Sequence, residues 1–130
     1  MHKNPKSEQK NILLVDDDMS VRTVFSSVLR REGYRVNTVK DGYEAIKVVE
    51  EKDFDLALVD LMMPGLDGIQ VLERIKSRRP EIRVVIYTGY GSVPTVVEAM
   101  RKGAVDYLAK PFSPDELKAG VKKALEKGED

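Results

Sequence analysis

The sequence predicts an α/β fold, a doubly wound (βα)5 sandwich in which helices cover both faces of a five-stranded parallel sheet. Five short apolar runs alternate with segments of helical period along the chain. Each run is nearly continuous in apolar residues, which is typical of strands buried on both faces. The length of 130 residues fits a single domain, so we expect one folded unit.

The predicted strands are rich in β-branched or aliphatic residues and are bounded by Asp, Gly, Lys or Pro. Helices between successive strands favour parallel pairing with right-handed crossovers. In chain order the five strands are Ile12–Val15, Tyr34–Val39, Leu56–Val59, Val84–Tyr87 and Tyr107–Ala109.

The segments between and after the strands carry apolar residues at helical spacing. In the first segment these residues follow the i, i+3, i+4, i+7 and i+8 pattern of one helix face, at Val21, Val24, Phe25, Val28 and Leu29. Four later segments repeat the pattern less fully, at Ala45, Ile46 and Val49; Ile69, Leu72 and Ile75; Val96, Val97 and Met100; and Leu117, Val121, Ala124 and Leu125.

Capping residues mark where these helices begin. Ser113 is predicted as an N-cap, with Pro114 at the first helical position. Asp18 is expected to cap the first helix, and Asp41 and Asp67 to act as turn or cap residues. These assignments take Asp18 out of the set of candidate metal ligands.

Composition and charge exclude several classes of protein. The 22 basic and 22 acidic residues leave a net charge of zero, so we expect no direct nucleic-acid binding by this chain. The absence of cysteine excludes a disulfide scaffold, a Cys-ligated zinc site and a Cys nucleophile. No stretch approaches the ~20 apolar residues of a membrane span, so we expect no membrane association and a cytoplasmic location.

Three parts of the chain are expected to differ in order. Residues 1–10 are polar and are predicted to form a flexible lead. Residues 11–127 are predicted to form the folded domain, and residues 128–130 a frayed C-terminus.

Polar groups follow four of the predicted strands, where ligands of an open parallel sheet bind. Asp16 and Asp17 follow the first strand, Asp60 the third, Thr88 the fourth and Lys110 the fifth. Like charges gathered at one edge need a cation or a proton between them, and carboxylate oxygens favour Mg²⁺. In such a pocket Asp60 is placed to attack phosphorus and become an aspartyl phosphate.

Four strings of the sequence resemble the signature blocks of the receiver (phosphoacceptor) domain of bacterial two-component response regulators. The resemblance extends from about Asn11 to Lys127. The strings are Leu14-Val15-Asp16-Asp17-Asp18, the stretch from Val59 to Gly68, Tyr87-Thr88-Gly89, and the stretch from Asp106 to Phe112.

This resemblance implies a flavodoxin-like sheet of order 2-1-3-4-5 and a role for each site residue. It implies that Asp60 is the phosphoacceptor and that Asp16 and Asp17 hold Mg²⁺, with Mn²⁺ as an alternative ion and Asp16 acting through water. The metal would also take Asp60 and the backbone carbonyl of Met62 as ligands. Thr88 and Lys110 would contact the phosphoryl group. Tyr107 would be the aromatic switch residue coupled to Thr88, and Lys110-Pro111 a cis bond.

The resemblance also implies how long the phosphorylated state lasts. In the family, the residues two places after the phosphoacceptor and two after the hydroxyl residue flank the path of the hydrolytic water, and here these are Met62 and Tyr90. Both side chains are bulky, and neither is an acid or amide suited to orienting water. We therefore expect slow self-dephosphorylation.

The function implied is that of a phosphorylation-dependent signalling switch. A sensor histidine kinase, or a small donor such as acetyl phosphate, would phosphorylate Asp60. The surface made by the fourth helix, fifth strand and fifth helix would then change and control an output, expected to be transcription through a separate or truncated effector domain. Homodimerisation on phosphorylation is a further expectation. The chain would catalyse only its own phosphorylation and dephosphorylation and would not be a turnover enzyme.

Three other interpretations compete with this one. Asp16 and Asp18 also match the Asp-x-Asp pattern of haloacid-dehalogenase-like phosphatases, whose first Asp is the nucleophile, but that pattern leaves Asp60 and the following residues unexplained. A flavin-binding module would need Gly and backbone N–H groups where the first strand is followed by acids. A degenerate receiver that binds partners without phosphorylation is disfavoured, because every family position for the chemistry is filled.

Overall fold

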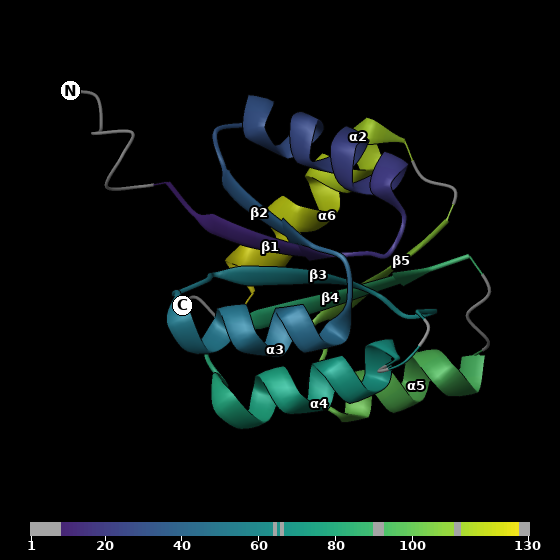
Figure 1. Ribbon diagram of the computed structural model, residues 1–130. Helices are drawn as coiled ribbons and strands as arrows, with labels where there is room; N and C mark the ends of the chain where they lie inside the picture. Colours follow the sequence, from purple (N-terminus) through teal and green to yellow (C-terminus); the bar gives the residue numbers. More distant parts are fainter. Residues whose placement is uncertain (1–8, 64, 66, 90–92, 111–112, 128–130) are drawn as a thin grey trace.

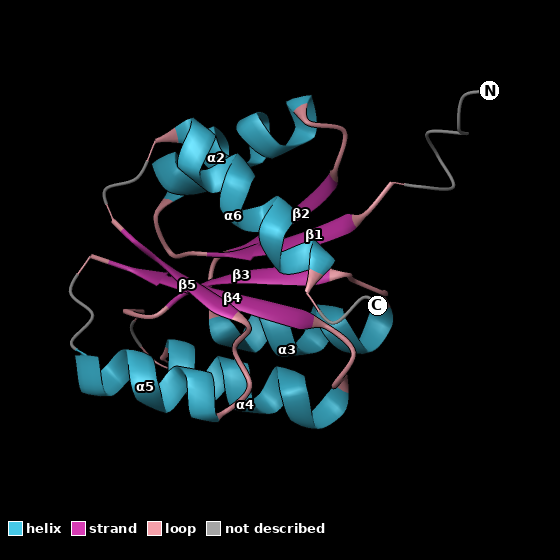
Figure 2. Ribbon diagram, turned by 180° about the vertical axis from the view of Figure 1, so that it is seen from behind, coloured by secondary structure: helices cyan, strands magenta, loops and turns pink. Residues whose placement is uncertain are grey.

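A sheet of five parallel strands forms the centre of the molecule, with helices in two layers around it (Figure 1). The computed structural model describes residues 9–63, 65, 67–89, 93–110 and 113–127. The strand order is β2-β1-β3-β4-β5, which confirms the predicted order. Helices α2 (Met19–Arg31) and α6 (Pro114–Glu126) cover one face, and α3 (Gly42–Glu51), α4 (Gly68–Arg78) and α5 (Val93–Arg101) cover the other (Figure 2).

The three central strands are buried along almost their whole length. They are β1 (Asn11–Val15), β3 (Leu56–Asp60) and β4 (Arg83–Thr88). The edge strands β2 (Arg35–Val39) and β5 (Asp106–Ala109) have mixed burial. The continuous apolar runs in the sequence therefore belong to strands that are covered on both faces.

Two apolar cores lie on opposite faces of the sheet, because successive side chains of a strand point to opposite sides. On the face of α3, α4 and α5, the core includes Leu13 and Val15 of β1 and Val71, Leu72 and Ile75 of α4. On the face of α2 and α6, the core includes Ile12, Leu14, Leu29, Leu58, Tyr87, Leu117 and Val121.

Side-chain caps begin the helices at the predicted places. Asp18 accepts hydrogen bonds from the backbone N–H groups of Ser20 and Val21, and Asp41 accepts one from Glu44. Asp67 and Ser113 each form a reciprocal capping box with the residue three positions later. Asp18, Asp41, Asp67 and Ser113 are therefore confirmed as caps.

The predicted apolar faces of two helices are partly wrong. Val24 is 54% exposed, because it lies five residues before the buried Leu29 and is rotated from it by about 140° around the helix. Among the side chains of α5 that the structure describes, Ala99 is buried, and Val97 and Met100 point away from the core at 41% and 40% exposure. Apolar spacing alone did not identify which side of these helices faces the sheet.

The structure extends three predicted strands, two of them to include site residues. Asp60 and Thr88 are the last residues of β3 and β4, where the sequence placed them just beyond the strands. Asp106 begins β5. Among the described residues, no helix has the length and apolar character needed to cross a membrane.

Candidate functional site

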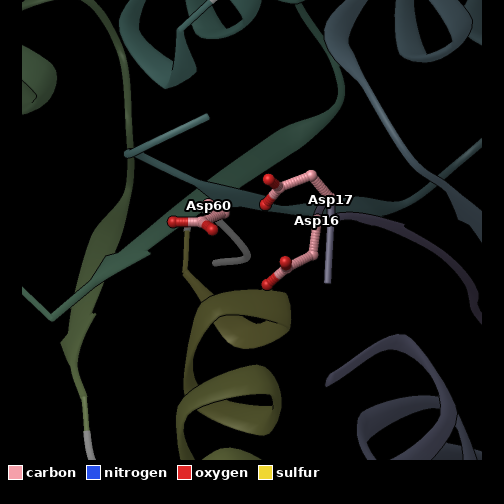
Figure 3. Close-up of side chains that lie close together, drawn as sticks. All are labelled: Asp16, Asp17 and Asp60. Carbon is pink, nitrogen blue, oxygen red and sulfur yellow. The ribbon is translucent and has the colours of Figure 1, made fainter. Parts of the chain in front are cut away.

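Three carboxylates gather at the carboxyl ends of β1 and β3 (Figure 3). Asp16 and Asp17 directly follow β1, and Asp60 ends β3, the strand that pairs with β1. One carboxylate oxygen from each of the three residues lies within 4.8 Å of the others. The predicted convergence of these acids at one sheet edge is confirmed.

Asp16 is fully buried and is held from three directions. Its Oδ1 accepts a hydrogen bond of 2.8 Å from the backbone N–H of Asp18. Its Oδ2 accepts one of 2.7 Å from the hydroxyl of Tyr87, and its carbonyl accepts one of 2.6 Å from Nη1 of Arg22. The orientation of this carboxylate is therefore fixed before any ligand arrives.

Asp17, its neighbour in the chain, is exposed. The site thus has a buried wall at Asp16 and an open side at Asp17. An ion bound here can keep part of its water shell, as Mg²⁺ usually does.

Asp60 is 5% exposed, and its Oδ1 accepts a hydrogen bond of 3.1 Å from the backbone N–H of Met62. Burial, followed by the charges of Asp16 and Asp17, raises the pKa of Asp60 from 3.8 to about 6, against the opposing effects of the Met62 N–H and Lys110. The ionised form of Asp60 is therefore unfavourable in the metal-free site, and a bound cation would stabilise it.

Lys110, which follows β5, supplies the positive charge of the site. Its Nζ lies 3.8 Å from Oδ2 of Asp16 and 3.8 Å from Oδ2 of Asp60. The same ammonium lies 5.0 Å from the centre of the Tyr87 ring. Lys110 is thus placed between the two buried acids, within reach of a group bound to either one.

Thr88 and Tyr107 lie on neighbouring strands. Thr88 is buried at the end of β4, and its carbonyl accepts a hydrogen bond of 2.9 Å from the backbone N–H of Lys110. Tyr107 pairs with Ile86, two residues before Thr88, so both side chains belong to the same face of the sheet. Tyr107 is 44% exposed, whereas Thr88 is buried.

Two predicted features lie outside the described residues, namely Tyr90 and the Lys110-Pro111 bond. Met62 is described, and its side chain is exposed beside the site.

The donor set is one that suits a hard divalent cation. Three carboxylates supply oxygen ligands, which Mg²⁺ and Mn²⁺ prefer. Repulsion among them is relieved by added positive charge. The residues present therefore fit the metal that the sequence predicts.

Tyr87 is the site residue that the sequence analysis missed as a functional group. It was assigned only to the fourth strand, yet it is fully buried and its hydroxyl contacts Asp16. Burial beside Asp16 raises its pKa well above the ordinary value of 10, so the phenol stays a donor at neutral pH. The sequence feature that could have identified Tyr87 is a tyrosine inside an aliphatic strand, because a buried phenol needs a hydrogen-bond partner.

A family model and curated relatives match nearly the whole chain. The model described as response regulator receiver domain matches residues 12–122. The transcriptional regulatory protein ZraR of Klebsiella oxytoca is 48% identical over 118 residues, which are 91% of this chain and 27% of that protein. Sporulation initiation phosphotransferase F of Bacillus subtilis is 39% identical over 116 residues, which are 89% of this chain and 94% of that protein. The chain therefore spans about a quarter of the length of the ZraR relatives.

Solved structures agree with this assignment. A CheY-like response regulator receiver domain protein from Methanospirillum hungatei has a TM-score of 0.89 and 32% identity, covering 92% of this chain and 96% of that one. The receiver domain of NtrX from Brucella abortus has a TM-score of 0.84 and 35% identity, covering 90% of this chain and 99% of that one. The chain belongs to the response regulator receiver domain family.

Proposed function

We propose that this chain is a phosphorylation switch in which Asp60 accepts a phosphoryl group in a reaction that requires Mg²⁺. The observation that carries the proposal is the position of Asp60, buried at the end of β3 within 4.8 Å of Asp16 and Asp17 and 3.8 Å from Lys110. Receiver domains generally bind Mg²⁺ at such an acidic cluster. Here Asp16, Asp17, Asp60 and the Met62 carbonyl would hold the ion, with Mn²⁺ as a substitute.

In the proposed reaction, a carboxylate oxygen of Asp60 forms a bond to phosphorus. The P–N bond of a phosphohistidine on the sensor kinase breaks, and its electron pair stays on the imidazole nitrogen. With acetyl phosphate, the P–O bond to the acetyl group breaks and acetate leaves. The transferred group spreads negative charge over its oxygens, and Mg²⁺ held by the acidic residues would neutralise part of that charge.

The chain's own residues stabilise the product. Lys110 would supply an ammonium to one phosphoryl oxygen, and Thr88 would donate its hydroxyl to another. The hydrogen bond of 3.1 Å from the Met62 N–H to Asp60 Oδ1 keeps the carboxylate oriented. The exposed Met62 side chain beside the site, together with Tyr90, would limit the approach of hydrolytic water, so that self-dephosphorylation is slow.

The signal would leave the site through Thr88 and Tyr107. Movement of the Thr88 hydroxyl toward the phosphoryl group frees space on the sheet face that Tyr107 shares. Tyr107, which is 44% exposed, would turn inward into that space. The surface formed by α5, β5 and α6 would then change and bind its partner.

The output would be transcription through an effector domain, in a cell where a cytoplasmic histidine kinase domain is the donor. Besides ZraR, the alginate biosynthesis transcriptional regulatory protein AlgB of Pseudomonas aeruginosa is a relative, 41% identical over 119 residues. Homodimerisation on phosphorylation is part of this proposal. A second candidate output is onward transfer of the phosphoryl group, favoured by the name of the relative sporulation initiation phosphotransferase F.

The contacts of Asp18 argue against the phosphatase alternative. Asp18, the acid/base of that alternative, is engaged in capping α2. The chain would therefore modify itself and not turn over free phosphomonoesters.

Intact-mass spectrometry after incubation with acetyl phosphate tests the proposal. We expect one phosphoryl adduct with Mg²⁺, none after chelation, and none in Asp60→Asn. Asp53→Asn, which removes an exposed acid distant from the site, is the matched control and keeps the adduct. An adduct that survives Asp60→Asn and disappears in Asp16→Asn, together with hydrolysis of p-nitrophenyl phosphate, would establish the phosphatase instead.

A further inference from the structure

Tyr87 joins two parts of the acidic pocket that come from opposite ends of the chain. Its ring is fully buried on the face of α2 and α6. It belongs to β4, and β3 lies between β4 and β1, so the side chain crosses β3 to reach the residues after β1. There its hydroxyl lies 2.7 Å from Asp16 Oδ2 and 3.4 Å from the Val15 carbonyl oxygen.

The contact with Asp16 is short and charge-assisted. The phenol donates to Oδ2 while the Asp18 N–H, at 2.8 Å, donates to Oδ1. Two donors on two oxygens fix the rotation of the carboxylate about its Cβ–Cγ bond. The lone pairs that remain are therefore presented in one direction.

The ring of Tyr87 is in contact with the cation of the site. The Lys110 ammonium lies 5.0 Å from the ring centre, within the range of a cation–π interaction. Phe25 packs against the same ring, with centroids 5.9 Å apart and planes tilted by 58°. The ring is thus held by α2 and in turn supports Lys110.

We propose that Tyr87 is a positioning residue of the acidic pocket, whose hydroxyl orients Asp16 for a divalent cation and whose ring seats the Lys110 ammonium. This inference rests on the proposed function, because it assigns Asp16 to the metal. Groups that hydrogen-bond to metal ligands commonly change metal affinity by ~10–100-fold when removed. The hydroxyl and the ring are expected to make separable contributions.

Tyr87→Phe separates them, since it removes the hydroxyl and keeps the ring. Without the hydroxyl, Oδ2 of Asp16 keeps the Lys110 ammonium at 3.8 Å as a cationic partner. The carboxylate would turn toward it, and a metal ion would have to pull it back. We expect the dissociation constant for Mg²⁺ to rise about tenfold.

Tyr34→Phe is the matched control. Tyr34 is half-buried just before β2, at the amino end of the sheet, and removing its hydroxyl leaves the acidic pocket untouched. We expect Mg²⁺ binding unchanged in this variant. A third variant, Tyr87→Leu, removes hydroxyl and ring together and should also slow phosphorylation when Mg²⁺ is saturating, because Lys110 loses its support.

The experiment is calorimetric titration of the metal-free proteins with MgCl₂, followed by phosphorylation rates with acetyl phosphate at varied Mg²⁺. The expected result is weaker Mg²⁺ binding in Tyr87→Phe and a phosphorylation rate that returns to the wild-type value at saturating Mg²⁺. A general loss of structure would lower the rate at every Mg²⁺ concentration. Tyr87→Phe with Mg²⁺ affinity within twofold of wild type would overturn the inference and leave the proposed function standing. Absence of Mg²⁺ binding in wild type would instead contradict the proposed function.

A measurement on wild-type protein keeps the inference testable if Tyr87→Phe does not fold. In protein with ¹³C-labelled tyrosine rings, the Cζ signal of Tyr87 is assigned through the contact of its ring protons with the Phe25 ring. We expect this signal to shift along the Mg²⁺ titration while that of Tyr34 stays in place. A Tyr87 signal that does not move at saturating Mg²⁺ would overturn the proposal.

Discussion

The acidic pocket and the α5–β5 side of the molecule are built in opposite ways. At the pocket, Asp16 is fully buried, Asp60 is 5% exposed, and both carboxylates accept hydrogen bonds. On the α5–β5 side, three large side chains (Val97, Met100 and Tyr107) are at least 40% exposed. The two regions are adjacent, since Thr88 of the pocket pairs with Ala109 of β5.

This difference matches what the proposed switch requires of its two regions. Chemistry at Asp60 needs fixed geometry, which burial and hydrogen bonds supply. A surface that changes needs side chains with few packing partners, because a close-packed region does not deform gradually. We therefore expect substitutions at the pocket to have large effects on stability and those on the α5–β5 side to have small ones.

The largest effect is expected at Gly68, at the start of α4. A Cβ added there would lie 2.5 Å from Leu61 Cα and 2.6 Å from the carbonyl oxygen of Asp60. Both are backbone atoms of the segment that carries Asp60, so the loop would have to move. We predict that Gly68→Ala lowers the free energy of unfolding by about 3 kcal/mol, measured by urea denaturation. A loss below about 1 kcal/mol would mean that the pocket is less rigid than described.

The second effect concerns the charge of Asp60 in metal-free protein. Its pKa is about 6 in the folded state against 3.8 ordinarily, so the folded state binds more protons between these pH values. Stability is therefore lost as the pH rises from about 4 to about 6 and stays reduced above that window. Asn does not ionise, so we predict that Asp60→Asn is more stable than wild type by about 2 kcal/mol at pH 7.5, and equal below pH ~4.

Thermal melts across this pH range, with and without Mg²⁺, measure the effect. Saturating Mg²⁺ should stabilise wild type and reduce or reverse the advantage of Asp60→Asn at pH 7.5. An Asp60→Asn variant less stable than metal-free wild type at pH 7.5 would contradict the conclusion that the charge of Asp60 destabilises the folded state. Asp53→Asn, at an exposed acid, is the control and should not change the pH dependence.

Gly120 of α6, which faces Leu108 of β5, is the counterpart of Gly68 on the β5 side. Here an added Cβ would lie 2.9 Å from Cδ2 of Leu108 on β5, the end of a flexible side chain. Ala also favours the helix over Gly by about 1 kcal/mol. We predict that Gly120→Ala changes the free energy of unfolding by less than about 1 kcal/mol in the same urea experiment. A loss as large as that of Gly68→Ala would remove the contrast between the two regions.

The smallest effect on stability is expected for Tyr107→Ala. The exposed ring gives up little packing, so the change in the free energy of unfolding should be within about 0.5 kcal/mol. Phosphorylation of Asp60 by acetyl phosphate should proceed at the wild-type rate. Hydrogen exchange should show that the response of α5 and β5 to phosphorylation is lost. A normal response in this variant would exclude Tyr107 from the switch.

Much of the fold was predictable because burial on both faces leaves a clear trace in the sequence. The apolar run from Leu56 to Val59 predicts a central strand without further information. The acids were predictable because Asp16 and Asp60 follow such runs, and parallel strands end at one edge. The central strand and the acids were predicted correctly because both depend on the order of residues along a single strand.

The misses depend on contacts between elements. Val24 and Val97 have helical spacing, but only packing on the sheet decides which side of a helix is buried. The hydrogen bond from Tyr87 to Asp16 spans 71 positions and crosses an intervening strand. Such a contact depends on the strand order as well as on the length of the side chain, and a local sequence motif does not predict their combination.

Identification of the phosphorylated residue tests the central claim most directly. Borohydride reduces an aspartyl phosphate to homoserine, which mass spectrometry of peptides locates in the sequence. After incubation of wild-type protein with Mg²⁺ and acetyl phosphate, we predict conversion at Asp60 and at no other aspartate. Conversion at Asp16 or Asp17 in place of Asp60 would contradict the assignment of the pocket.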